Sequence, residues 1–137
     1  MVPPNLVVIF QAESAHQFWV RTPLSNPGVN KVEGIDYLLS SNATNLQSQL
    51  TPETQLLIIG SDRGSVTEPL QKLVAKAREL NPGVRVVSYA GTELQGIDTA
   101  DFIQKGSHLA AERFVMEVAH AIDMARNAER AGEVFST

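Results

Sequence analysis

Five short, β-favouring apolar runs, separated by helix-like and polar segments, constrain the fold of this chain most strongly. Leu6–Phe10 and Leu56–Ile59 are apolar without interruption, which is typical of strands covered on both faces. We expect the other three strands at Ile35–Leu39, Val84–Ser88 and Phe102–Ile103. Strands that alternate with helices indicate a parallel sheet with helices on both faces.

The segments between these runs predict helices of unequal strength. The best specified follows Thr67, a potential N-cap, and carries one apolar stripe until Asn81-Pro82-Gly83 ends it. Weaker or shorter helices are expected at 15–22 and 42–50, and a long one from a Ser107 cap to about Arg126. The Gly91–Asp98 segment is too short for a packed helix with its connecting loops, so we expect a turn or one helical coil there.

The length and the apolar pattern predict one domain followed by a short tail. The 137 residues suffice for a single core and not for two. Because the apolar pattern stops after about Arg126, we assign 1–126 to the domain and 127–137 to a solvated C-terminal tail. Residues 23–34 lack periodicity and predict a long loop.

Composition excludes several classes of function. With 11 basic and 15 acidic residues, a formal net charge of −4 and no basic block, nucleic-acid binding is not expected. No apolar run is long enough to span a membrane, and no signal peptide is recognisable. The absence of cysteine excludes a thiol nucleophile and fits a cytoplasmic location. His16, His108 and His120 stand apart in the sequence, so no metal site is predicted.

A lysine follows the fifth predicted strand in the run Ala100-Asp101-Phe102-Ile103-Gln104-Lys105-Gly106. This run and the order of elements over Leu6–Ala125 resemble the receiver domain of bacterial response regulators, except that Gly106 replaces the usual proline. The resemblance implies an α/β fold, a flavodoxin-like (CheY-like) doubly wound five-stranded parallel sheet. The short Gly91–Asp98 segment implies that its fourth helix is shortened or missing.

The resemblance also implies which residues would carry the chemistry of that family. Receivers phosphorylate an aspartate after the third strand, hold Mg²⁺ with an acidic pair after the first, and use a hydroxyl residue and a lysine nearby. Here these positions fall on Gly60, on Phe10-Gln11, near Ala90 with Ser88 two residues earlier, and on Lys105. Only the lysine matches. We therefore predict a degenerate receiver (a pseudo-receiver) with no catalytic residue, no metal and no cofactor.

Two alternatives use neighbouring residues. Glu13 and Asp62 lie in the loops after the first and third strands and could serve as shifted acids of a working phospho-switch. Alternatively, the loop before the Thr67 helix could bind a small phosphorylated ligand through its glycines, serines and arginine. The residues of this candidate anion loop are Gly60, Ser61, Arg63, Gly64 and Ser65.

The expected function is therefore a non-enzymatic signalling or scaffold module that acts through protein–protein contacts and does not depend on phosphorylation. The partner would be another protein or a second copy of this chain. In ordinary receivers, the fourth helix, fifth strand and last helix form the contact face. Because the fourth helix is predicted to be short, we expect Leu94 and Ile97 to form a substitute apolar patch.

Overall fold

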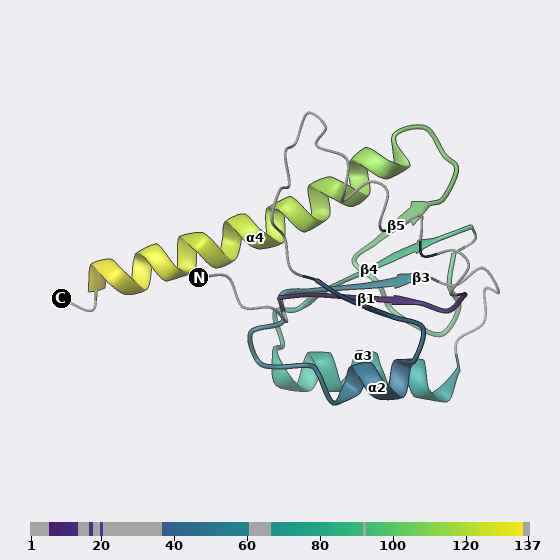
Figure 1. Ribbon diagram of the computed structural model, residues 1–137, viewed down its shortest axis with the longest axis horizontal. Coiled ribbons are helices and arrows are strands. Elements are labelled where there is room, and N and C mark those ends of the chain that lie inside the picture. Colours follow the sequence, from purple (N-terminus) through teal and green to yellow (C-terminus); the bar gives the residue numbers. More distant parts are fainter. Residues whose placement is uncertain are drawn as a thin grey trace.

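The computed structural model describes residues 6–13, 17, 20, 37–60, 67–91 and 93–135 (Figure 1). Five strands form one sheet: β1 (Val7–Gln11), β2 (Leu38–Ser40), β3 (Leu56–Gly60), β4 (Arg85–Ala90) and β5 (Asp101–Gln104). All pairs are parallel, and the strand order is β2-β1-β3-β4-β5. This is the flavodoxin-like order, in which ligand sites lie at the carboxyl ends of the strands near the point where the order reverses. The predicted fold class is confirmed.

Helices cover the two faces of the sheet. α2 (Ala43–Gln47) and α3 (Glu68–Leu80) lie on one face and α4 (Ala110–Phe135) on the other (Figure 1). Alternate residues of the central strands supply the two cores: Val8 and Leu57 pack with α2 and α3, while Ile9 and Ile58 pack with α4. β1 and β3 are buried along their whole length, which accounts for the continuous apolar runs that make up all but the last residue of each.

The α3 helix forms where its apolar stripe predicts it. Leu70, Leu73, Val74 and Ala77 are buried, and Asn81 is the C-cap. Thr67 is the N-cap residue, as expected, although its side chain makes no capping hydrogen bond. In the shorter α2, the Asn42 side chain does cap, accepting from the Asn45 amide.

The connection between β4 and β5 contains no helix in residues 91 and 93–100, the part that the structure describes. The expected shortening of the fourth helix is therefore confirmed. The predicted apolar patch in this segment is wrong, because Leu94 is only 5% exposed and packs into the α2–α3 core. Ile97 packs against the same core. The shortened connection closes over the sheet instead of presenting apolar side chains to solvent.

Several predicted boundaries differ from the structure. β1 begins and ends one residue later than expected, at Val7 and Gln11, and β4 continues to Ala90, because backbone pairing with neighbouring strands extends beyond the apolar residues. Ser107 does not cap the last helix; its hydroxyl donates to the Gln104 carbonyl at 2.6 Å. α4 instead begins at Ala110, after Leu109 adopts a positive φ of 65°.

The last helix continues past the predicted end near Arg126, since α4 runs to Phe135. The last side chain of α4 that the structure shows as buried is Ile122. The rest of the helix projects away from the sheet (Figure 1). The division into a domain and a tail at 127 stays a prediction, as do the helix expected at 15–22 and the loop at 23–34, which lie almost entirely outside the described residues. None of the described helices combines the length and apolar character needed to cross a membrane.

Candidate functional site

The carboxyl ends of the strands bring four sequence-predicted positions together. Gln11 and Gly60 are direct register partners at the ends of β1 and β3. Ala90 ends β4, and the backbone amide of Lys105 donates to its carbonyl at 2.9 Å. Positions separated by most of the chain therefore meet at one edge of the sheet. The parallel register of the sheet is what brings these residues together.

Gln11 occupies the centre of this cluster. Its side chain is buried, with 1% of the residue exposed. The Lys105 ammonium donates to its Oε1 at 3.0 Å, and its Nε2 donates to the Glu13 carboxylate at 3.2 Å. A buried amide with both ends satisfied is an ordered structural element. The neutral Gln11 amide thus links the lysine to an acid in the loop after β1.

Gly60 leaves the space that the Gln11 amide fills. A Cβ built on Gly60 would lie far inside contact distance of Gln11 Oε1, 3.0 Å from Gln11 Cδ and 3.2 Å from the Tyr89 carbonyl oxygen. The φ of Gly60 is not in the left-handed region. Glycine is therefore favoured here because there is no room for a Cβ, and not because of the backbone conformation. We call Gln11, Gly60 and Lys105 the amide lock, because the amide sits between a missing side chain and the lysine.

The other positions implied by the resemblance serve the core. Phe10 is 6% exposed and packs in the core beneath α2 and α3. Ser88 is 1% exposed, and its hydroxyl donates to the Asp101 carbonyl at 3.4 Å. Ala90 is completely buried. The described contacts of these three residues are therefore those of buried strand residues.

Aromatic contacts connect Lys105 to the last helix. Its ammonium lies 5.7 Å from the centre of the Tyr89 ring, within the range of a cation–π interaction. That ring stacks on Phe114 of α4, with 4.8 Å between the centroids. Burial raises the pKa of the Tyr89 phenol, which keeps the ring neutral. Two aromatic rings therefore lie in a row between the lysine of the amide lock and α4.

The alternatives for this edge are only partly visible. Glu13 lies within reach of the lock through Gln11, whereas Asp62 lies outside the described residues. Apart from Gly60, the candidate anion loop also lies outside them, which concerns Ser61, Arg63, Gly64 and Ser65. Within the described part of the chain, no three His, Cys, Asp or Glu side chains gather as metal ligands. Both alternatives stay predictions.

Two arrangements could not have been found from sequence patterns. One is the amide lock itself, since the sequence places Gln11 and Gly60 at the site but does not show that one fills the space of the other. The second is an ion pair at the opposite end of the sheet, between Arg85 and Glu117. Its partners are 32 residues apart, and neither belongs to a recognisable motif.

Comparison with known proteins identifies the fold. No protein-family model and no curated protein sequence matches the chain. Among solved structures, it resembles the response regulator StyR, with a TM-score of 0.59 and 12% identity, over 95% of this chain and 65% of that one. A signal receiver domain of an HD domain-containing protein from Pseudomonas fluorescens matches with a TM-score of 0.52 and 17% identity. The match covers 84% of this chain and 96% of that one.

A third similar structure is a Burkholderia pseudomallei protein described as pilus assembly-related. Its TM-score is 0.57 at 10% identity, over 88% of this chain and 94% of that one. At sequence identities this low, what this chain shares with the three solved structures is the arrangement of helices and strands. The all-parallel sheet, its strand order and the helices on both faces agree with that arrangement. The chain therefore has the fold of response-regulator receiver domains.

Proposed function

We propose that this chain is a signalling or scaffold module of the receiver fold that acts through protein–protein contacts and does not depend on phosphorylation. The observation that carries the proposal is the amide lock. The place of a phosphoryl-accepting side chain is taken by Gly60, and the space beside it is filled by Gln11. The lysine that would neutralise a phosphoryl group instead donates to the Gln11 amide.

The physical chemistry of phosphoryl transfer supports this proposal. Such transfer relies on positioned oxygen ligands for Mg²⁺ and on charge neutralisation. Gln11 contributes a neutral amide whose oxygen is already engaged, and Phe10 contributes a buried ring. Without an acceptor at position 60, carboxylates elsewhere in the chain would have to accept the phosphoryl group and hold the Mg²⁺. The amide lock instead favours one fixed arrangement of the strand ends and, through Tyr89 and Phe114, of α4.

The fold is compatible with a scaffold role as well as a signalling role. In the pilus assembly-related neighbour, the matched region covers 94% of the solved chain, so the fold makes up nearly all of that structure. We propose that this chain likewise acts through the receiver fold itself. Its function would consist of surface contacts with another protein or with a second copy of the chain. Light scattering at high concentration would separate these two, since a strict monomer excludes the homodimer.

A phosphodonor experiment tests phosphorylation independence. The protein is incubated with acetyl phosphate and Mg²⁺, beside a phosphorylatable receiver as positive control, and measured by intact mass. We expect an adduct on the control and none on this chain. A stable adduct that disappears in Asp62→Asn would overturn the proposal in favour of the shifted-acid switch. Backbone amide spectra with and without beryllofluoride provide the second readout, and no change is expected.

A further inference from the structure

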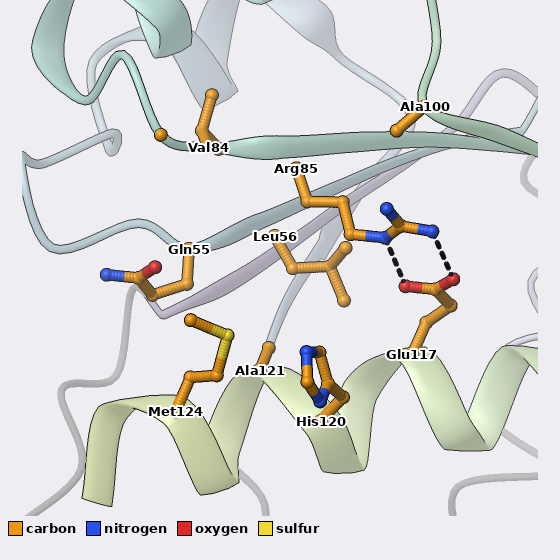
Figure 2. A pocket seen from close by; sticks show the side chains of 10 residues that line it. Gln55, Leu56, Val84, Arg85, Ala100, Glu117, His120, Ala121 and Met124 are labelled. Atoms are coloured by element: carbon orange, nitrogen blue, oxygen red, sulfur yellow. Dashed lines mark hydrogen bonds and ion pairs between the residues drawn. The ribbon is translucent and has the colours of Figure 1, made fainter. Parts of the chain in front are cut away.

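A hollow of about 340 Å³ lies between α4 and the amino ends of β3 and β4, at the opposite end of the sheet from the amide lock. Figure 2 shows Leu56 on the strand side and Ala121, Met124 and His120 on the helix side. A second hollow of about 390 Å³ adjoins it along α4 and shares Arg85, Glu117 and His120. We call the two together the α4 groove.

The groove has apolar ends. Met116 lines the second hollow and Met124 the first, and they are 59% and 53% exposed. Among the described residues, only Leu109 is another large hydrophobic side chain with comparable exposure. Two exposed methionines on the walls of one groove are typical of a surface that adapts to an apolar partner.

The middle of the groove carries a compensated charge. Arg85 binds Glu117 through two parallel hydrogen bonds of 2.7 and 2.9 Å (Figure 2). The Glu117 side chain is only 14% exposed, so its carboxylate is largely removed from water and satisfied by the guanidinium. An anionic occupant would meet the Glu117 carboxylate and would find Arg85 already engaged by it. A cationic occupant would compete with Arg85 for the same carboxylate. The groove is therefore complementary to an uncharged group.

The shape of the groove favours a chain over a compact molecule. Met116 and Met124 are eight residues apart on α4, roughly 12 Å along a helix that rises 1.5 Å per residue. An extended peptide covers this span with about four residues, at roughly 3.3 Å each. Beyond Met124 the helix continues to Phe135 and projects from the sheet (Figure 1).

From these observations, and resting on the proposed protein–protein function, we infer that the α4 groove is the docking site for an uncharged, apolar segment of a partner polypeptide. Its apolar side chains enter the hollows beside Met116 and Met124. Its neutral backbone crosses the Arg85–Glu117 pair, where guanidinium and imidazole groups line the path.

The test is a titration of the full chain with the neutral peptide acetyl-Leu-Ser-Leu-Ser-Leu-amide, followed by backbone amide chemical shifts. We expect saturable shifts around Arg85, Glu117 and His120, and an affinity that changes little over a roughly ten-fold rise in ionic strength. Met116→Glu and Met124→Glu should each weaken binding about ten-fold or more, as for anchors at an interface. Leu109→Glu, the same change at an exposed position of the chain outside the groove, should leave binding unchanged.

Several results would overturn the inference. These are the absence of saturable shifts, shifts centred on Lys105, an equal loss in Leu109→Glu, or tighter binding of a peptide with Glu in place of Ser. Concentration-dependent shifts at the groove without peptide would assign it to a second copy and would equally reject a foreign partner. The phosphodonor experiment is independent of these readouts: an adduct on Asp62 refutes phosphorylation independence and leaves peptide binding in the groove to be judged by the titration.

Discussion

The side-chain amide of Gln11 occupies the space into which a side chain at Gly60 would extend. The two residues are register partners at the ends of β1 and β3, and the amide is held there by Lys105 Nζ at 3.0 Å. Glycine at position 60 and glutamine at position 11 are therefore a matched pair. A substitution at either one has consequences that depend on the other.

The matched pair predicts that Gly60→Ala destabilises the protein. The added methyl collides with the Gln11 amide and presses on the Tyr89 carbonyl oxygen, and overpacking of this kind costs about 1–3 kcal/mol. The free energy of unfolding, measured by urea denaturation, should fall by that amount. The amide resonances of Lys105 should shift at the same time, because its acceptor moves.

A double-mutant cycle separates this cause from a general intolerance of the site. Gln11→Ala alone should also destabilise, since Lys105 loses its acceptor. In the Gln11→Ala background, however, Gly60→Ala should cost clearly less than in the parent, because the collision with the Gln11 amide is gone and only the contact with the Tyr89 carbonyl oxygen remains, while alanine suits a strand better than glycine. Additive losses in the double variant would contradict the matched pair.

Much of the fold was predictable because the central strands are recognisable in the sequence as continuous apolar runs. β1 and β3 are buried on both faces, and burial on both faces requires the continuous apolar runs that the sequence shows. The ends of these strands were not predictable in the same way. Gly60 is a poor strand former by type and Gln11 breaks the apolar pattern, and both are extended because a neighbouring strand pairs with them.

The site was predictable as a place and not as an arrangement. The register of a parallel sheet puts Gln11, Gly60 and Lys105 at one edge, so their positions follow from the strand assignments. Which atom fills which space depends on the side-chain conformation of Gln11, for which sequence carries no signal. The α4 groove was not predictable either, since Arg85 and Glu117 meet across 32 residues.

The positive φ of Leu109, just before α4, leads us to expect that a glycine at this position stabilises the protein. Leu109 has a φ of 65°, a left-handed conformation that costs an ordinary residue about 1–2 kcal/mol. Its side chain is 48% exposed, so little packing is lost on replacement. Leu109→Gly should therefore raise the free energy of unfolding by up to about 1 kcal/mol, after the greater freedom of glycine in the unfolded chain is deducted. Leu109→Ala keeps the Cβ and should bring no gain; equal gains would remove backbone strain as the reason.

Asp101 predicts a loss of stability in acid. Burial works to raise the pKa of its carboxyl, but the hydrogen bonds from Arg113 and the Phe102 amide, with the charges of Arg113 and Arg85, lower the pKa below its ordinary value of 3.8. The unfolded chain thus takes up this proton at a higher pH than the folded chain. The contribution is fully present above about pH 4 and is lost as the pH falls through the lower folded pKa.

Because Asp101 and Arg113 are 37% and 44% exposed at their side chains, we expect this contribution to stay below about 1 kcal/mol. The free energy of unfolding should be measured from neutral pH into acid. Asp101→Asn should flatten the acid limb of that curve, and Arg113→Gln should flatten it partly, since Arg113 supplies only some of the stabilising contacts. A limb as steep in Asp101→Asn as in the parent would contradict the assignment.

The ion pair of the α4 groove predicts an asymmetry between its two partners. The Glu117 side chain is 14% exposed and that of Arg85 is 42% exposed. Arg85→Gln strands a largely buried carboxylate and should lower the free energy of unfolding by about 2–3 kcal/mol, at or below the roughly 3–5 kcal/mol lost when a fully buried pair is broken, because the Arg85 side of this pair is partly exposed. Glu117→Gln leaves a cation that water can reach, and should cost about 1 kcal/mol. Lys72→Gln, which breaks an exposed i, i+4 pair with Glu68 on α3, is the control and should cost under about 0.5 kcal/mol. Urea denaturation of the three variants measures the order of their losses in free energy of unfolding. Equal losses in Arg85→Gln and Glu117→Gln would show that burial of the carboxylate does not set this order.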